Sequence, residues 1–355
     1  MDFTRAQLGF LSWKHEVPFP YAAHAPQFQS WHTFDSTQTW IPIFLPTNPD
    51  SHTNNLAEPN ETASISRLAL LTWNIDGASP RTEERVTDII THITDLQEVD
   101  IIFFQEVSKP ALQQILKDDR IRKSWLSSEC DNMELGNRPF TTMTLLSKAR
   151  FTNSQGEANT TLGPIWRVSF PSHFGRDALC CDIFVSPSEE PLSPSTTSTP
   201  ATRVRLMNVH LDSLPIKPSH RPQQISIASS FLHIAGKGLV AGDFNPVLDE
   251  DADLLERNNL TDVWSYLRPG DSGFTWGLDG EQPFPPNRLD KVATLELRSH
   301  NIETLEPKRL SGASEPSEDG PLWSDHHGLL YSFSLPNEEK SRTPPASMKE
   351  PIGGA

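Results

Sequence analysis

Oxygen-bearing side chains follow an apolar stretch near the start of this sequence. In 70-LLTWNIDG-77, a run of apolar and β-prone residues ends in Asn74 and Asp76, two residues apart. Residues two apart on an extended chain point to the same side, so this amide and this carboxylate should lie next to each other. Their pairing at a strand end raises the question of what chemistry needs them there.

The arrangement recurs along the chain, where predicted strands begin or end in polar residues. The six sets are Asn74 with Asp76, Gln105 with Glu106, His210 with Asp212, Asp243 with Asn245, Asp290, and Asp325 with His326. Each set alone has an ordinary explanation, such as an Asx turn, a core histidine or a surface loop. Together they favour a site assembled from strand-end loops on a rigid scaffold.

This set of side chains is rich in oxygen, and it has neither a cysteine cluster nor paired histidines at zinc spacing. Its carboxylates and amides are Asp76, Glu106, Asp243, Asp325, Asn74 and Asn245. A few hard oxygen ligands suit Mg²⁺ or Mn²⁺, whose coordination is completed by water and substrate phosphate. Such a cation would also supply positive charge to a chain of net charge −16.

The histidines of the set suit phosphate chemistry. A charged imidazole at His210 or His326 would donate to phosphate oxygens and stabilise a pentacovalent phosphorus. Asp243, beside Asn245 on one turn, would activate and orient an attacking water. These residues therefore predict metal-dependent hydrolysis of a phosphate ester.

Composition limits the partners and the compartment. An acidic chain has no general attraction for nucleic acid, so polyanion binding must come from a local basic patch or a bound metal. Three cysteines make no disulfide framework, and the sequence shows no signal peptide and no apolar run of membrane-spanning length. We therefore expect an intracellular protein of the nucleus or cytoplasm that acts as a monomer and without a membrane.

Predicted strands and helices alternate through the middle of the chain. The expected strands are 68–75, 101–107, 141–147, 165–170, 178–185, 203–210, 238–243, 289–295 and 328–334. The expected helices are 81–97, 110–126 and 222–235. This pattern predicts an α/β fold of two packed sheets with helices outside, not a single parallel sheet.

The flanking regions differ in composition from this middle part. Residues 1–64 are rich in Pro, Asn, Thr and His and are predicted to be a disordered arm, part of which its aromatic residues would attach to the domain. Residues 65–335 form the predicted catalytic domain, with a low-complexity hairpin loop at 186–202. Residues 336–355 are predicted to be a disordered tail.

Six motifs, in this order, carry a family resemblance: TWNIDG, QEV, HLDS, GDFN, RLDK and SDHHGL. Over about residues 66–335 the chain resembles the endonuclease/exonuclease/phosphatase superfamily, which has the DNase I-like fold. Within it, the chain most resembles the 5′-tyrosyl-DNA phosphodiesterase (type 2) family, through FPSHFGRDALCCDIF at 170–184, DVWSYL at 262–267 and FTWG at 274–277.

The resemblance implies a four-layer α-β-β-α sandwich of two mixed sheets that hydrolyses phosphodiesters with Mg²⁺. It implies that Glu106 is the principal metal ligand, with Asn74 and Asp76 nearby and Asp325 at the edge of the metal site. It also implies roles for further residues. Asp243 and Asn245 would act on the attacking water, and Asp290 would orient His326. His210 would be a second donor to phosphate, Arg176 would contact phosphate, and Trp276 would form a wall of the substrate groove. Arg176 as a solvated surface residue and Trp276 as core packing remain the alternatives.

The chain departs from the family pattern at several positions. Residues 1–64 show no ubiquitin-binding helical module, and 186–202 is an insertion. Phe244 replaces a smaller residue, His327 stands where Trp is frequent, and Pro139 precedes the aromatic Phe140. These differences leave the predicted chemistry intact and leave the leaving group open.

Three functions remain in competition. The first is a Mg²⁺-dependent phosphodiesterase acting on DNA 5′ ends, including protein-linked ones. The second keeps the mechanism and changes the substrate to abasic DNA, an RNA tail, a phosphoinositide or a sphingolipid. The third is a non-catalytic binding module, which would have lost a catalytic residue, and none is missing. A dinucleotide site at 236-GKGLVAG-242 is excluded because its glycines do not open a helix after a strand.

Overall fold

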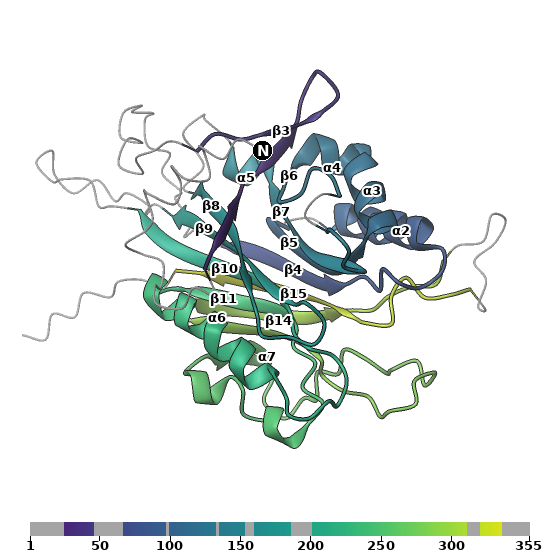
Figure 1. Ribbon diagram of the computed structural model, residues 1–355, viewed down its shortest axis with the longest axis vertical. Coiled ribbons are helices and arrows are strands. Elements are labelled where there is room, and N and C mark those ends of the chain that lie inside the picture. The colour runs from purple at the N-terminus through teal and green to yellow at the C-terminus, as the bar shows by residue number, and fades with distance from the viewer. Residues whose placement is uncertain are drawn as a thin grey trace, which may run out of the picture.

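Two mixed β-sheets pack face to face and carry helices on their outer surfaces (Figure 1). The computed structural model describes residues 25–45, 67–96, 99–132, 135–152, 160–185, 201–310 and 320–335. Within these residues the predicted four-layer α-β-β-α sandwich is confirmed.

The first sheet has seven strands in the described residues, in the order β1-β8-β9-β10-β11-β13-β12. Their bounds are β1 (Gln27–Gln29), β8 (Thr160–Ser169), β9 (Asp177–Val185), β10 (Thr202–His210), β11 (Gly238–Asp243), β13 (Asp290–Leu295) and β12 (Thr261–Asp262). Only β10 and β11 pair in parallel, and the other pairs are antiparallel.

The second sheet has eight strands in the same described ranges, in the order β14-β15-β4-β5-β7-β6-β2-β3. Their bounds are β14 (Arg298–Leu305), β15 (Gly328–Ser334), β4 (Leu68–Asn74), β5 (Ile101–Ser108), β7 (Phe140–Ser147), β6 (Trp125–Ser127), β2 (His32–Phe34) and β3 (Trp40–Pro42). Here β4 and β5 form the parallel pair.

The strand register gathers the polar strand ends at one edge of the sandwich. His210 pairs with Asp243 across β10 and β11, and Asp243 pairs with Asp290 across β11 and β13. In the other sheet Asn74 pairs with Gln105 across β4 and β5. Since parallel strands end on the same side, these residues face one another where the two sheets meet.

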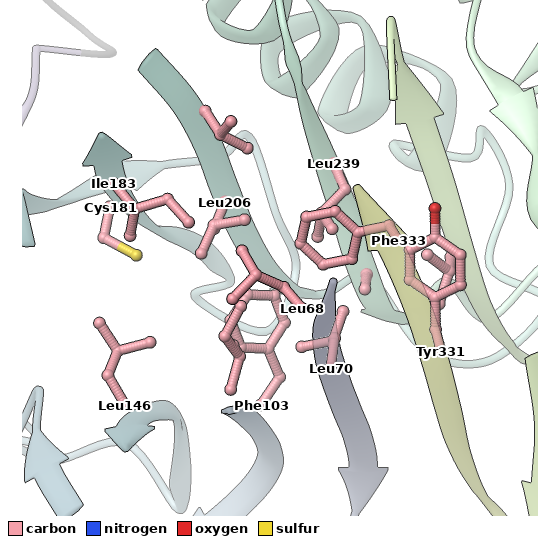
Figure 2. Close-up of a cluster of buried hydrophobic side chains, with 14 of the residues drawn as sticks. Leu68, Leu70, Phe103, Leu146, Cys181, Ile183, Leu206, Leu239, Tyr331 and Phe333 are labelled. Atoms are coloured by element: carbon pink, nitrogen blue, oxygen red, sulfur yellow. The ribbon is translucent and has the colours of Figure 1, made fainter. Parts of the chain in front are cut away.

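Apolar side chains fill the space between the sheets. Leu68 and Phe103 from the second sheet pack against a layer that includes Leu206 and Leu239 from the first (Figure 2). These residues are at most 2% exposed, so the sheets are joined by a dry, close-packed layer. The edge that carries the polar strand ends lies at one end of this layer.

Helices cover the outer faces of both sheets. Their bounds are α2 (Thr82–Asp95), α3 (Lys109–Lys117), α4 (Asp119–Ser124), α5 (Lys148–Phe151), α6 (Arg221–Ala235) and α7 (Val263–Leu267), with the 3₁₀ turns η3 (Asp249–Asp251) and η4 (Glu256–Asn258). In α2, Val86, Ile89, Ile90 and Ile93 recur at helical spacing and are buried on the second sheet. None of the helices in the described part of the chain is long and apolar enough to span a bilayer.

Several elements differ from the predictions, among them one helix and one strand of the second sheet. The helix expected over 110–126 is interrupted at Asp118, whose carboxylate accepts a hydrogen bond from the Arg120 N–H and caps α4. Strand β14 was not predicted at all. Only Ile302 among its residues is fully buried, so no apolar alternation marks it in the sequence.

Part of the predicted N-terminal arm is folded. Residues 27–42 contain β1, β2 and β3, so this stretch is not disordered, and an aromatic residue, Trp31, attaches it to the domain as the sequence suggested. Trp31 is 1% exposed in the layer between the sheets, and its Nε1–H donates to the Gly163 carbonyl at 3.0 Å. Residues 1–24 and 46–64 of the arm lie outside the described residues, as does the tail 336–355.

The predicted loop at 186–202 joins an antiparallel pair of strands, because Val185 of β9 pairs with Thr202 of β10. This pairing is that of a hairpin, as expected. Residues 186–200 themselves lie outside the described part of the chain.

Replacing Trp31 should destabilise the whole protein. Trp31→Ala removes a fully buried indole, and such truncations lower the free energy of unfolding by about 3–5 kcal/mol. Phe44→Ala is the control in the same segment, because Phe44 is 58% exposed, and it should change that free energy by less than about 0.5 kcal/mol. Urea unfolding followed by fluorescence measures both, and equal, small effects would contradict the packing of this segment into the core.

Candidate active site

A hydrogen bond between the two sheets fixes the orientation of Asp243. Nδ2 of Asn74, at the end of β4, donates to Oδ2 of Asp243, at the end of β11, over 3.1 Å. The other carboxylate oxygen accepts from the backbone N–H of Asn245 at 3.0 Å. Asn74 and Asp243 are each 1% exposed, so this carboxylate is held in one position inside the protein.

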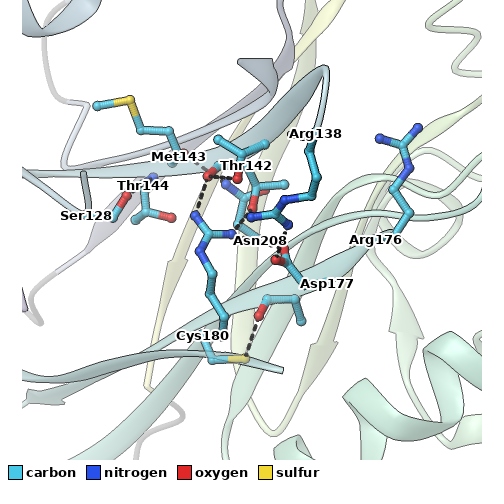
Figure 3. Close-up of polar contacts among 12 residues, drawn as sticks. Ser128, Arg138, Thr142, Met143, Thr144, Arg176, Asp177, Cys180 and Asn208 are labelled. Atoms are coloured by element: carbon cyan, nitrogen blue, oxygen red, sulfur yellow. Dashed lines mark hydrogen bonds and ion pairs between the residues drawn. The ribbon is translucent and has the colours of Figure 1, made fainter. Parts of the chain in front are cut away.

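A second polar bridge lies beneath this bond. Nε2 of Gln105 donates to Oδ1 of Asn208 at 2.8 Å, and Nδ2 of Asn208 donates to the carbonyls of Phe104 and Met143. The contact between Asn208 and Met143 is visible in Figure 3. These buried bonds join β10 of the first sheet to β5 and β7 of the second, and so set the spacing of the strands that carry the site.

The carboxyl group of Asp243 is a base poised near neutral pH. Burial raises its pKa most, and the neighbouring Asp290 raises it further, to about 7. The adjacent His326 acts in the opposite direction. A carboxyl group with this pKa is ionised in a substantial fraction of molecules at pH 7 and binds a proton readily.

His326 forms a close pair with Asp290. Its Nδ1 lies 2.7 Å from Oδ2 of Asp290, and its Nε2 lies 4.0 Å from Oδ2 of Asp243. Burial lowers the pKa of His326, but the two carboxylates outweigh burial and raise it well above the usual value. The imidazole is therefore charged at neutral pH, with Nδ1–H donating to Asp290 and Nε2–H directed toward the site.

His210 behaves differently, although the sequence suggested a charged imidazole there too. Burial lowers its pKa well below the usual value, and Arg176 and His326 lower it further. Its Nε2 lies 3.4 Å from Oδ2 of Asp243, and within the described residues neither ring nitrogen has a hydrogen-bond partner. The ring lies parallel to that of Phe140, with centroids 5.9 Å apart. His210 is thus a neutral imidazole with unused donor capacity.

Three carboxylates form an acidic rim beside these buried groups: Asp76, Glu106 and Asp325. All three are half-buried. Burial raises the pKa of Asp76 and of Glu106, and the charge of Asp325 raises both further. Oδ2 of Asp325 accepts from Nε1–H of Trp276 at 3.0 Å. Half-buried carboxylates that raise one another's pKa are hard oxygen donors of the kind that a divalent cation binds, so these residues fit Mg²⁺.

The backbone is strained where it presents the site. Asp76, Glu106 and Asn245 have φ values of 45°, 56° and 46°, in the left-handed region that non-glycine residues seldom adopt. Glu106 lies in a β-bulge, where the pairing of β5 with β7 shifts between Phe104 and Val107. Bulges redirect side chains. Asp76 and Asn245 follow the ends of β4 and β11, whereas Glu106 lies within β5, and backbone conformations of this kind cluster at functional sites.

Gly77 keeps the two bends in contact. A Cβ at this position would lie 1.9 Å from the carbonyl oxygen of Glu106. No other residue type fits there without moving the backbone. The glycine that follows Asp76 in the sequence is therefore needed for the close approach of the Asp76 turn to the Glu106 bulge.

Arg176 lies at the site and not on the surface. It is 8% exposed, its Nη2 donates to Oγ of Ser213 at 3.0 Å, and its guanidinium lies 5.0 Å from the centroid of Phe140. Its Nε has no hydrogen-bond partner within the described residues. The alternative of a solvated surface arginine is thus wrong. Figure 3 draws Arg176 together with the ion pair of Arg138 and Asp177.

A family model described as the Endonuclease/Exonuclease/phosphatase family matches residues 71–339 of the chain. The match contains every one of the polar strand ends described above. The chain belongs to this family.

Curated relatives from this family carry one name. Tyrosyl-DNA phosphodiesterase 2 of Homo sapiens is 25% identical over 325 residues, which cover 85% of this chain and 78% of that protein. The protein of the same name from Xenopus tropicalis is 24% identical over 282 residues, which cover 76% and 67%.

Solved structures share the fold. A humanized D. rerio TDP2 has a TM-score of 0.57 at 18% identity, covering 76% of this chain and 99% of that one. D. rerio TDP2 complexed with a single strand DNA product has a TM-score of 0.56 at 18% identity, covering 76% and 100%. An endonuclease/exonuclease/phosphatase family protein from Bacteroides thetaiotaomicron reaches 0.55 at 12% identity, covering 78% and 97%. The resemblance to tyrosyl-DNA phosphodiesterases of this family, expected from the motifs, is confirmed.

The structure brings the sequence-predicted residues of this family member to one edge. Trp276 is half-buried beside Asp325 and His326, so it is not core packing. A cleft of about 440 Å³ opens beside Asp325, and His327 lines it. Asn208 and Arg85 were missed. The only sequence signal for Arg85 is a charge four residues before Ile89, on the apolar face of the helix.

Arg85 holds the backbone of the acidic rim. Its buried guanidinium, 1% exposed, donates to carbonyls on both sides of the site. The acceptors are the carbonyl oxygens of Ile75, Asp76, Ser79, Pro80 and Trp323. Trp323 precedes Asp325 by two residues. The same side chain therefore positions the turn of Asp76 and the segment that carries Asp325.

Replacing Arg85 should destabilise the fold. Arg85→Met leaves several buried carbonyls without a donor, and each unsatisfied buried group costs about 1–3 kcal/mol. The matched control is Arg81→Met, one turn earlier, where a 41% exposed side chain pairs with the exposed Glu84. Such surface pairs contribute about 0–1 kcal/mol. Urea unfolding compares the two variants, and equal losses of stability would contradict the anchoring role of Arg85.

Proposed function

We propose that this protein is a Mg²⁺-dependent phosphodiesterase that hydrolyses phosphodiester bonds at DNA 5′ ends, including 5′-phosphotyrosyl adducts, and so acts in DNA repair. Family membership supports phosphodiester hydrolysis, and the name of the curated relatives supports the substrate. The observation that carries the proposal is the buried Asp243, fixed by Asn74 and Asn245, beside a charged His326 and an acidic rim.

The acidic rim would hold the metal. Glu106, Asp76 and Asp325 offer hard oxygen ligands, and Arg85, whose Nη1 lies 3.4 Å from Oδ2 of Asp76, brings one positive charge to these three carboxylates. When bound, Mg²⁺ supplies positive charge to the phosphate oxygens and to the departing oxygen. Asp243, Asp290 and His326 also bring ligand atoms within 4.8 Å of one another, but the charged His326 has no lone pair for a metal.

Asp243 would prepare the nucleophile. Its carboxylate accepts a proton from water, and the water oxygen attacks phosphorus in line with the bond to be broken. Asn74 and Asn245 hold the carboxylate so that its orientation does not change during the reaction. Fixing the base in this way removes the entropy cost of aligning it.

Positive and neutral donors would take up the charge on the phosphate. The charged His326, held by Asp290, donates from Nε2, and the neutral His210 donates through a ring N–H that has no partner in the described residues. Arg176 adds a guanidinium on the side of His210. These donors are buried and preoriented, which is the condition for strong electrostatic stabilisation of a transition state.

The leaving group would need no protein acid. The bond from phosphorus to the tyrosine oxygen breaks as the bond to the water oxygen forms, and the electron pair leaves with the phenolate. The phenol has a pKa of about 10, so its anion departs far more readily than an alkoxide. Solvent then protonates it, and the DNA keeps a 5′-phosphate. The ring of Trp276 would form one wall of the groove that holds the DNA.

Cleavage of matched oligonucleotides tests the proposal. Three 5′-labelled substrates carry a 5′-phosphotyrosyl end, an abasic site or no modification. Wild type should release tyrosine selectively and only with Mg²⁺. Glu106→Gln should need at least tenfold more Mg²⁺, since even residues behind metal ligands cost about 10–100-fold in affinity. Glu256→Gln, exposed and remote, is the control.

The alternative results point to other substrates. Cleavage of abasic or unmodified DNA in preference to the tyrosyl substrate would overturn the 5′-phosphotyrosyl assignment. Failure on all three oligonucleotides would direct the search to RNA tails, phosphoinositides and sphingomyelin-like diesters. A Mg²⁺ titration that is the same in Glu106→Gln and wild type would remove Glu106 from the metal site.

The pH dependence should report Asp243. As a base it must lose its proton, and its pKa is about 7. The rate should therefore rise about tenfold per pH unit on the acid side and level off near pH 7. In Asp243→Asn the rate should fall by about 10²–10⁴-fold and lose this acid limb. The exposed Asp249→Asn serves as control, and an Asp243→Asn variant that keeps the acid limb would assign the base elsewhere.

A further inference from the structure

A second group of metal-ligating side chains lies beside the site and takes no part in the mechanism above. It is the histidine cluster, defined as His173, Asp212 and His220. One ring nitrogen of each histidine and one carboxylate oxygen of Asp212 all lie within 4.8 Å of one another. His173 belongs to the turn after β8, and the other two belong to the segment between β10 and α6.

Asp212 is a fixed and ionised ligand. Its Oδ1 accepts hydrogen bonds from Oγ of Ser172 and from Nε2 of Gln224, and its Oδ2 accepts from the backbone N–H of His173 at 3.0 Å. Burial opposes its charge, but these hydrogen bonds outweigh burial and lower the pKa of Asp212. A carboxylate oxygen accepts about two bonds, so Oδ2 keeps one lone pair free.

His220 directs a nitrogen at that oxygen. Its Nδ1 lies 3.5 Å from Oδ2 of Asp212 and has no hydrogen-bond partner within the described residues. Two ligands of one tetrahedral Zn²⁺ with bonds of about 2.0–2.1 Å stand about 3.4 Å apart. The separation is therefore long for a hydrogen bond and close to the edge of a zinc coordination tetrahedron.

His173 would supply the third ligand. Its exposed ring lies parallel to that of His220, with centroids 4.2 Å apart and 9° between the planes. Rotation about its side-chain bonds turns a ring nitrogen toward the gap, and an exposed side chain makes this rotation without displacing neighbours. Two imidazoles with one carboxylate are a ligand set of zinc and not of Mg²⁺, which prefers oxygen.

We propose that His173, Asp212 and His220 bind a Zn²⁺ ion at a site separate from the catalytic centre, with water as the fourth ligand. The ion would join two segments that together position Arg176. Oγ of Ser172 accepts from the backbone N–H of Arg176, and Oγ of Ser213 accepts from its guanidinium. A zinc ion in the histidine cluster would therefore hold in place the two segments that contact Arg176.

Zinc stoichiometry tests the site directly. The full chain, freed of metal with a chelator that is then removed, is titrated with Zn²⁺ against a chromophoric zinc indicator, in excess Mg²⁺. In this titration wild type should bind one Zn²⁺ tightly. His173→Ala and His220→Ala should each lose it, whereas His233→Ala should keep it. His233 is exposed on α6, away from the cluster.

The variants should remain folded, so the test does not depend on stability. His173 is exposed, and His220 precedes α6 without a side-chain capping bond. Circular dichroism without zinc should match wild type, and Zn²⁺ should raise the melting temperature of wild type and His233→Ala only.

Three results would overturn the proposal. One is the absence of bound Zn²⁺ at micromolar concentrations in wild type. Another is equal stoichiometry in wild type, His173→Ala and His220→Ala. The third is zinc lost in Asp243→Asn but kept in His220→Ala, which would assign the ion to the catalytic centre. None of these results bears on phosphodiester cleavage, so the two proposals fail separately.

Discussion

The hydrogen bond from Asn74 to Asp243 is the contact on which the site depends, because it crosses from one sheet to the other. It fixes the base and ties together the ends of two strands that are 169 positions apart in the chain. The bridge of Gln105 with Asn208 beneath it prevents the sheets from sliding. The amide N–H groups of Asn74 and Gln105 find their acceptors in this register, and a shifted register would leave them buried without partners, which is costly. A change in sheet packing would break both bridges and separate the side chains of the candidate site.

Charge explains why the buried groups differ in protonation although they lie so close together. The acidic rim, Asp243 and Asp290 crowd negative charge into a space with little water, which favours a charged His326. For His210 burial lowers the pKa most, and Arg176 and His326 lower it further, so this imidazole stays neutral. The result is one charged donor and one neutral donor on either side of one base. Neighbouring groups with divergent pKa values are characteristic of acid–base sites.

The sequence predicts which residues form the site better than it predicts their protonation states. Polar residues at strand ends converge because parallel strands end together, so Asn74, Glu106 and Asp243 are recognisable from periodicity and motif alone. The neutral state of His210 cannot be recognised in this way, since it depends on the groups that surround the ring in space. Arg85 is missed for a similar reason, because its carbonyl partners lie on segments up to 238 positions away. Strand β14 is missed because one buried side chain gives no pattern.

The segment 25–45 precedes the family-matched region, yet it belongs to both sheets (Figure 1). It adds β1 to β8 of the first sheet, passes Trp31 between the layers, and adds β2 to β6 of the second. Without it, β8 would present unpaired N–H and C=O groups around Ile165, Trp166 and Arg167, and β6 would lose its pairing at Ser127. Unpaired strand edges of this kind are templates for pairing with other chains. The part of the chain that completes both sheets thus begins well before the family-matched residues, so a fragment limited to those residues would expose strand edges on which other chains can pair.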